Sequence, residues 1–85
     1  MSWLHIEFLP SAAADFRALP SDIKSRVILS LDIIGRDPNA GKPLQGPYSG
    51  LRSLPVGDYR VVYRWDARNW VVLIQCIGHR RDIDR

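Results

Sequence analysis

The sequence predicts an α+β domain in which two helices cover one face of an antiparallel sheet. Three observations support this: an alternating segment opens the chain, two helical segments follow it, and three closely spaced strand segments end it. The order β-α-α-β-β-β places a helical hairpin before an antiparallel meander, and such a hairpin packs on one sheet face. A chain of 85 residues builds one small core, so we expect a single domain over 1–85.

The chain begins with a predicted strand and a short helix. Residues 3–9 alternate between polar and apolar side chains, which is the period of a strand with one buried face. Pro10 is expected to end this strand, and Ser11 is a candidate N-cap for a helix over 12–19. Pro20 cannot continue that helix, so the chain must turn there.

A second helix is predicted over 22–34. Apolar side chains recur at helical spacing on one side of it, namely Ile23, Val27, Leu31 and Ile34. Ser21 is a candidate N-cap, and Gly35 is placed to end the helix.

The C-terminal half predicts a long loop and three strands. Residues 37–50 contain three prolines and three glycines, which indicates a loop. Strands are expected over 51–54, 59–65 and 70–77, joined by four-residue turns that imply antiparallel pairing. Residues 78–85 read as a polar tail.

Composition excludes several classes of protein. Hydrophobic residues make up 46% and charged residues 25%, which is typical of a folded soluble domain. The single cysteine, Cys76, lies in an apolar run, so we expect a reduced core residue. The sequence has no signal-peptide pattern and no apolar run of ~18 residues, which predicts a cytoplasmic protein with no membrane span. One cysteine and two histidines argue against a metal site, and no metal or cofactor is expected.

The positive charge is arginine, and it lies in the second half of the chain. Residues 1–41 hold four cations and five acids, a net of −1, whereas residues 42–85 hold eight cations and four acids, a net of +4. Ten of the twelve cations are arginine. Because guanidinium presents a planar fork of donors, this composition favours a phosphate or carboxylate partner.

These arginines concentrate at three places in the predicted meander. Arg52 lies on its first strand, Arg60 and Arg64 on its second, and Arg80 and Arg81 follow its last. Antiparallel pairing brings the end of the strand over 70–77 beside the start of the strand over 59–65, so we expect Arg80 to lie near Arg60. Arg52, on the strand over 51–54, is expected to lie across the hairpin from the Arg60 region. One cluster on the uncovered sheet face would neutralise a phosphodiester and stabilise its transition state. The alternative is that each is a solvated surface arginine.

Two further side chains have candidate roles near this cluster. His79 carries the imidazole, a group that exchanges protons near neutral pH, so it is a candidate general base or acid. Alternatively it is a polar residue at a strand end, held by a backbone carbonyl. Tyr48 lies in the loop, where it would stack on a nucleobase or pack within a turn.

Two segments carry a resemblance to a known family. Residues 42–64 (KPLQGPYSGLRSLPVGDYRVVYR) followed by 77–83 (IGHRRDI) resemble the RelE/ParE superfamily of bacterial type II toxin–antitoxin systems, and most closely its RelE branch. The resemblance implies the RelE-like, microbial ribonuclease-type fold. It also implies a toxin that inhibits translation as an mRNA interferase, a ribosome-dependent endoribonuclease. The implied partners are the ribosome and mRNA, a cognate RelB-like antitoxin, and a toxin–antitoxin hetero-oligomer on operator DNA.

The resemblance also assigns roles by position. Arg60 matches the phosphate-stabilising strand arginine, Arg80 the arginine that stabilises the leaving group or transition state, and Arg52 a basic residue of the first meander strand. Two positions depart from the family pattern. Leu54 replaces a second basic residue, and Asp84 falls near the tyrosine implicated in activating the ribose 2′-hydroxyl.

The implied reaction is attack of a 2′-hydroxyl on the adjacent phosphate, which leaves a 2′,3′-cyclic phosphate. Without the tyrosine, the base would be His79, Asp84 or a ribosomal group, or the activity would be weak. The side chains expected to bind RNA are Lys42, Tyr48, Arg52, Arg64 and Arg81. Two alternatives stay open: a ParE-like toxin without nuclease activity that poisons DNA gyrase, and a catalytically weakened homologue that still binds an antitoxin.

Overall fold

A computed structural model describes residues 4–79 and 81 of the chain. Its elements, in order, are β1 (His5–Phe8), α1 (Pro10–Arg17), α2 (Ser21–Arg36), β2 (Lys42–Pro43), the 3-10 helix η1 (Gly46–Tyr48), β3 (Arg52–Val56), β4 (Tyr59–Asp66) and β5 (Val71–His79). The strands form one five-stranded sheet in the order β1-β5-β4-β3-β2. The predicted α+β class and the C-terminal meander are confirmed.

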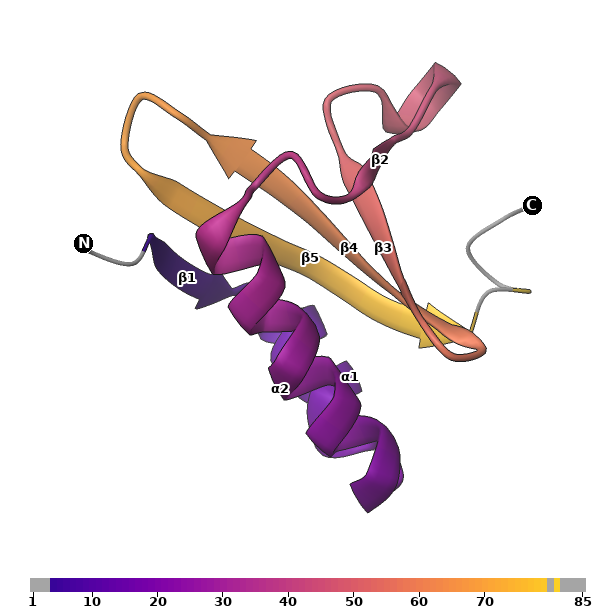
Figure 1. Cartoon of the computed structure of the whole chain (residues 1–85). Helices are drawn as coiled ribbons and strands as arrows, with labels where there is room; N and C mark the ends of the chain where they lie inside the picture. The colour runs from indigo at the N-terminus through magenta and orange to yellow at the C-terminus, as the bar shows by residue number, and fades with distance from the viewer. Residues whose placement is uncertain (1–3, 80, 82–85) are drawn as a thin grey trace.

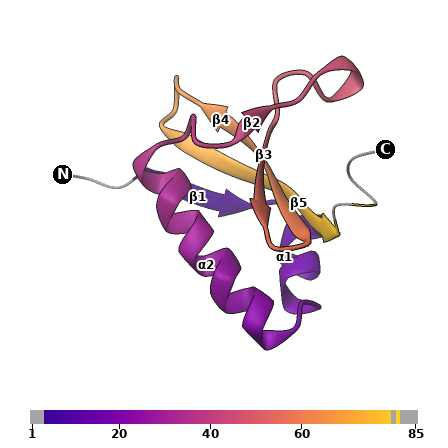
Figure 2. The ribbon, with the colours of Figure 1, turned by 45° about the vertical axis from the view of Figure 1, so that its right-hand side comes forward.

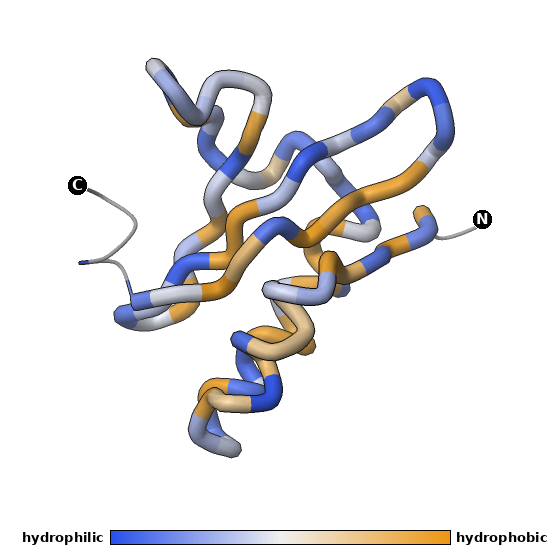
Figure 3. The backbone as a smooth tube through the Cα atoms, turned by 180° about the vertical axis from the view of Figure 1, so that it is seen from behind, coloured by the Kyte–Doolittle hydropathy of each residue, from blue (hydrophilic) through white to orange (hydrophobic). Residues whose placement is uncertain are grey.

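The sheet is mixed, because β1 runs parallel to β5 while the other neighbours pair antiparallel. The two helices provide the long connection that leads from β1 toward the rest of the sheet (Figure 1). In Figure 3, β5 is a mostly hydrophobic stretch and the turn between β4 and β5 is hydrophilic. An apolar strand of this kind suits a position with neighbours on both sides.

Both helices lie on the same side of the sheet, as Figures 1 and 2 show. The core between these layers consists of Ala12, Leu19, Val27, Ile34, Val56, Val61, Tyr63, Val72, Ile74 and Ile77. The predicted stripe of α2 faces this core, with Val27 and Ile34 fully buried and Ile23 and Leu31 packed against it. None of the described helices is long and apolar enough to cross a membrane.

Helix α1 begins earlier than predicted and closes an edge of the sheet. It begins at Pro10, whose fixed φ suits the first helical turn, so Ser11 is not the N-cap. The Ser11 hydroxyl instead donates to the Gln75 carbonyl at 3.2 Å, and the Asp15 carboxylate accepts from the Ile77 amide at 3.0 Å. These two bonds provide partners for backbone groups in the part of β5 that extends beyond its pairing with β1.

Helix α2 also differs from the prediction at both ends. Pro20 is its N-cap and Ser21 its first residue, while Gly35 lies inside the helix, which continues to Arg36. The helix does not continue into Asp37, which has an extended backbone, because a residue before a proline, here Pro38, is disfavoured in helical conformation.

The predicted loop over 37–50 contains two short elements. Lys42 pairs with Ser53 and Pro43 with Arg52, so β2 forms the outer edge of the sheet, where a proline is tolerated. Helix η1 follows β2 within the same segment.

Two meander strands are longer than predicted. Strand β3 extends to Val56, which leaves only Gly57 and Asp58 as the turn, and Gly57 has the positive φ of 62° that this turn requires. Strand β5 includes Gly78 and His79, which the sequence assigned to the polar tail.

Candidate functional site

Alternation along β4 divides its side chains between the two faces of the sheet. Val61 and Tyr63 are fully buried in the core beneath the helices. Arg60 and Arg64 therefore point to the other face. We call this the open face and define it by Lys42, Ser53, Arg60 and Arg64, since residues paired directly across antiparallel strands share a face.

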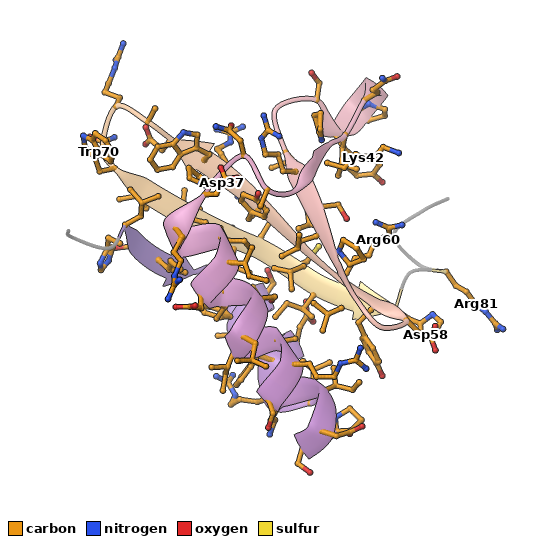
Figure 4. All side chains as sticks on the ribbon, viewed as in Figure 1. Asp37, Lys42, Asp58, Arg60, Trp70 and Arg81 are labelled. Atoms are coloured by element: carbon orange, nitrogen blue, oxygen red, sulfur yellow. The ribbon has the colours of Figure 1, made fainter. Side chains whose placement is uncertain are left out.

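Arg60 is held on the open face by a hydroxyl group. Its Nη1 donates a hydrogen bond to Ser53 Oγ at 3.3 Å, and Ser53 is only 1% exposed. Lys42 lies directly opposite Ser53 on the neighbouring strand. In Figure 4 the Lys42 and Arg60 side chains both extend away from α2. Two cations thus flank one buried serine on the open face.

The structure corrects the expected position of Arg52. The sequence placed it across the hairpin from the Arg60 region, but Arg60 pairs with Pro55, and Arg52 pairs with Tyr63. Arg52 therefore points to the helix side of the sheet. Its Nη1 donates to the carbonyl oxygens of Gly41 at 2.8 Å and Asn39 at 3.4 Å.

The Tyr63 hydroxyl also forms hydrogen bonds with this segment, residues 38–41. It accepts a hydrogen bond from the Gly41 amide at 2.8 Å and donates one to the Pro38 carbonyl at 2.7 Å. A Cβ at Gly41 would lie 2.7 Å from this hydroxyl oxygen, so a side chain there would collide with it. Burial raises the pKa of Tyr63, although the Gly41 bond and the Arg52 charge oppose this rise. The phenol therefore stays protonated and keeps its bond to Pro38.

Sequence reasoning missed this role of Tyr63. Besides its burial in the core, its hydroxyl and Arg52 together fix residues 38–41, and Lys42 follows directly. We call these contacts the Tyr63 clamp. The signal present in the sequence was Gly41, the glycine that precedes β2. A glycine there allows the backbone to approach the tyrosine closely.

His79 lies on the side of the sheet opposite Arg60. It pairs with Tyr59, and the two rings meet edge to face with centroids 5.5 Å apart. Its Nδ1 lies 3.3 Å from the Arg81 amide, which donates a hydrogen bond to it. The expected proximity of the His79 and Arg60 side chains is therefore wrong, because the pairing register makes Gly78 the partner of Arg60.

The remaining predicted site residues that the structure describes are dispersed. Arg64 is exposed on the open face, opposite Leu73 of β5. Tyr48 is 52% exposed at the end of η1, and Arg81 is exposed beyond β5. Arg80 and Asp84 lie outside the described residues.

Leu54, which replaces a basic residue of the family pattern, pairs with Val61 and packs against the core. Cys76 pairs with Val62 and is partly buried. Burial raises the pKa of the Cys76 thiol, and the charge of Asp15 raises it further. Within the described part of the chain, no group of three histidine, cysteine or acidic side chains is placed to hold a metal ion.

The open face has the chemistry of a phosphate-binding surface. Arg60 offers a guanidinium fork fixed by Ser53, and Lys42 adds a point charge beside it. Arg64 continues the positive charge along the same strand. Such donors bind phosphate oxygens and stabilise charge that develops on them.

Comparisons with known proteins agree with this architecture. A family model described as "ParE toxin of type II toxin-antitoxin system, parDE" matches residues 6–84. Toxin RelG of Mycobacterium tuberculosis (strain ATCC 25618 / H37Rv) is 34% identical over 82 residues, or 94% of this chain and 94% of RelG. Toxin RelE of the same strain is 34% identical over 78 residues, or 89% of this chain and 80% of RelE.

A solved structure shows the same fold. A chain in the crystal structure of the toxin–antitoxin complex RelBE2 from M. tuberculosis has a TM-score of 0.84 and 31% identity. The match covers 93% of this chain and 100% of that chain. The similarity thus extends along nearly the whole length in both sequence and fold.

Proposed function

Because the chain belongs to the ParE toxin family of type II toxin–antitoxin systems, within the RelE/ParE superfamily, we propose that it is the toxin of such a system and cleaves mRNA on the ribosome. The observation that carries this proposal is the fixed position of Arg60 on the open face, where Ser53 holds it beside Lys42. The chain then acts in the cytoplasm as a single RelE-like domain, where ribosomes and mRNA are its targets.

In the proposed reaction a ribose 2′-hydroxyl attacks the adjacent phosphate. The 2′ oxygen forms a bond to phosphorus, and the bond from phosphorus to the 5′ oxygen of the next nucleotide breaks. The products are a 2′,3′-cyclic phosphate and a 5′-hydroxyl, which takes up a proton. Arg60 stabilises the negative charge that accumulates on the phosphate oxygens, and Arg80 acts on the leaving group.

A base must remove the proton of the 2′-hydroxyl. The His79 ring packs on Tyr59, on the side of the sheet away from Arg60, which disfavours it for this role. We assign the role to Asp84 or to a ribosomal group. General base catalysis contributes about 10²–10⁴ in rate, so a chain without its own base would still be a slow nuclease driven by arginine electrostatics.

The proposed silencing partner is a RelB-like antitoxin, since similar chains have been solved in RelBE complexes. Its acidic groups would pair with the exposed cations, so its affinity should fall as salt rises. The two proteins would form the hetero-oligomer that binds operator DNA.

The test is translation in vitro with the purified chain, followed by mapping of mRNA ends on the ribosome. We expect cuts within the ribosome-bound codon, with 5′-hydroxyl groups on the downstream fragments. An intact message at concentrations that still arrest growth would refute the nuclease proposal.

A second candidate function is poisoning of DNA gyrase, as in the ParE branch. Leu54 favours it, because this position contributes to the core rather than to a basic surface. A supercoiling assay separates the two functions, because only a ParE-like toxin would inhibit gyrase and accumulate cleaved DNA. A chain that is active in neither assay and leaves growth unimpaired would be a weakened homologue.

A further inference from the structure

A second feature of the open face is a hollow at the end where β4 turns into β5. It has a volume of about 500 Å³. The lining residues that matter here are Gly50, Arg64, Asp66, Arg68 and Leu73. Arg68, in the turn, is a cation that the sequence did not single out as a binding residue.

The hollow carries a net positive charge. Arg64 and Arg68 are both exposed, and in the described part of the chain neither lies within salt-bridge distance of a carboxylate. Among the described residues, Asp66 is the only carboxylate in the lining, and it accepts hydrogen bonds from the Asn69 side chain at 2.8 Å and the Asn69 amide at 3.2 Å. Asn69 is therefore the main partner of Asp66, and the charge of Arg68 acts on the same carboxylate and helps to lower its pKa. Two guanidinium groups against one carboxylate leave the lining with a net positive charge for an anionic ligand.

The lining of the hollow suits a sugar–phosphate chain. Gly50 contributes no side chain to its wall, and its φ of 92° is one that L residues rarely adopt. Leu73, which pairs with Arg64, adds an apolar surface to the lining. An apolar surface next to guanidinium groups suits ribose and base faces together with phosphate oxygens.

The hollow lies on the same face of the sheet as Arg60. Arg64 lies four residues after Arg60 on the same face of β4. At the rise of a strand, this separates the two side chains by roughly 13 Å. A nucleic-acid strand that reaches Arg60 can therefore also contact Arg64 with a different phosphate.

We propose that this hollow binds the ribose-phosphate backbone of RNA, through Arg64 and Arg68, next to the place where the strand is cut. The identity of the ligand as RNA rests on the proposed function. The RNA is either the message itself or ribosomal RNA beside it. The hollow contributes to affinity, whereas Arg60 carries the chemistry.

The test compares two double variants that each remove two positive charges. Arg64→Gln/Arg68→Gln changes the hollow, and Arg17→Gln/Arg36→Gln, on the helices, is the matched control. The probes are a 2′-deoxy RNA oligonucleotide, which this chemistry cannot cut, and isolated small ribosomal subunits. Affinity is measured across a salt series, and thermal melts establish that both variants are folded.

For the hollow variant we expect at least about tenfold weaker binding. Its salt slope should be lower by about 1.4, because each phosphate of a single strand that a cation neutralises adds about 0.7 to the slope. The control should match the wild type. Weaker binding to the oligonucleotide identifies the message as the ligand, and weaker binding to the subunits alone identifies ribosomal RNA.

Wild-type affinity and slope on both probes would overturn the inference. A loss confined to an acidic antitoxin peptide would also overturn it, because the hollow would then bind protein. If the hollow variant binds RNA more weakly but the wild-type protein cuts no message, the nuclease proposal is refuted and the RNA-binding site is supported.

Discussion

The Tyr63 hydroxyl accepts a hydrogen bond from the Gly41 amide at 2.8 Å, from within the core of the sheet. The bond ties the chain that follows α2 to β4, next to the edge strand β2. Gly41 immediately precedes Lys42, so a buried tyrosine fixes the backbone that carries one of the two cations beside Ser53. Tyr63, together with Arg52, thereby links the core to the backbone that carries Lys42.

Replacing Tyr63 by phenylalanine should destabilise the protein. It leaves the buried amide of Gly41 and the carbonyl of Pro38 without this partner, and the cost of such a loss is about 1–3 kcal/mol. Chemical denaturation measures it, and hydrogen exchange should show a more open segment over 38–44. Tyr48→Phe, at an exposed residue, is the control and should change stability by less than about 0.5 kcal/mol. Equal effects of the two variants would show that the clamp contributes nothing.

Stability should fall at alkaline pH through the same tyrosine. Burial raises the pKa of Tyr63, so the unfolded chain loses this proton first as pH rises. This difference in pKa stabilises the folded state. The stabilisation is fully present below about pH 10 and is lost as pH rises through the pKa of Tyr63 in the folded state. Denaturation from pH 8 to 11 should show a steeper decline for the wild type than for Tyr63→Phe. Parallel curves would contradict the assignment.

Arg52→Ala should mainly lower stability, whereas Arg60→Ala should mainly weaken RNA binding. Arg52→Ala loses charged hydrogen bonds to two backbone carbonyls, worth about 1.5–3 kcal/mol where buried and less at this partly exposed site. We expect lower stability and an unchanged salt slope for RNA binding. Arg60→Ala should melt closer to the wild type and lower the salt slope by about 0.7. A stable Arg52→Ala variant with a reduced slope would place Arg52 in the RNA site.

Cys76 should react slowly with alkylating agents at neutral pH, because burial and the charge of Asp15 raise the pKa of its thiol. Asp15→Asn keeps an oxygen that can accept from the Ile77 amide but removes the charge. The alkylation rate of this variant should therefore rise, as followed by mass spectrometry. Asp22→Asn, on the exposed first turn of α2, is the control. No change in either variant would mean that burial alone protects the thiol.

Much of the fold was predictable because burial imposes a period on the sequence. The stripe that includes Val27 and Ile34 predicted α2 and its buried face, and both are confirmed. The alternation around Arg60 and Arg64 placed both arginines on the uncovered side of the sheet, as the register requires. Strand β2 was not predicted, because it is only two residues long and includes Pro43, and a proline indicates a loop in most sequences.

The site was harder to predict because it depends on register. Strand β3 is two residues longer at its end than the pattern indicated, so Arg52 pairs with Tyr63 and not near Arg60. Adjacent residues of a strand point to opposite faces, so a small shift moves a side chain across the sheet. His79 illustrates the same effect, since it extends β5 and turns its ring toward Tyr59.

In the proposed reaction, Arg60 on the open face stabilises the phosphate during cleavage of ribosome-bound mRNA. The most direct measurement is the yield of mRNA fragments in translation reactions with equal amounts of folded wild-type, Arg60→Ala and Arg17→Ala protein. Loss of a transition-state donor of this kind costs about 10²–10³ in rate, so the Arg60→Ala reaction should yield almost no fragments, and Arg17→Ala should match the wild type. Undiminished cleavage by Arg60→Ala would contradict the account.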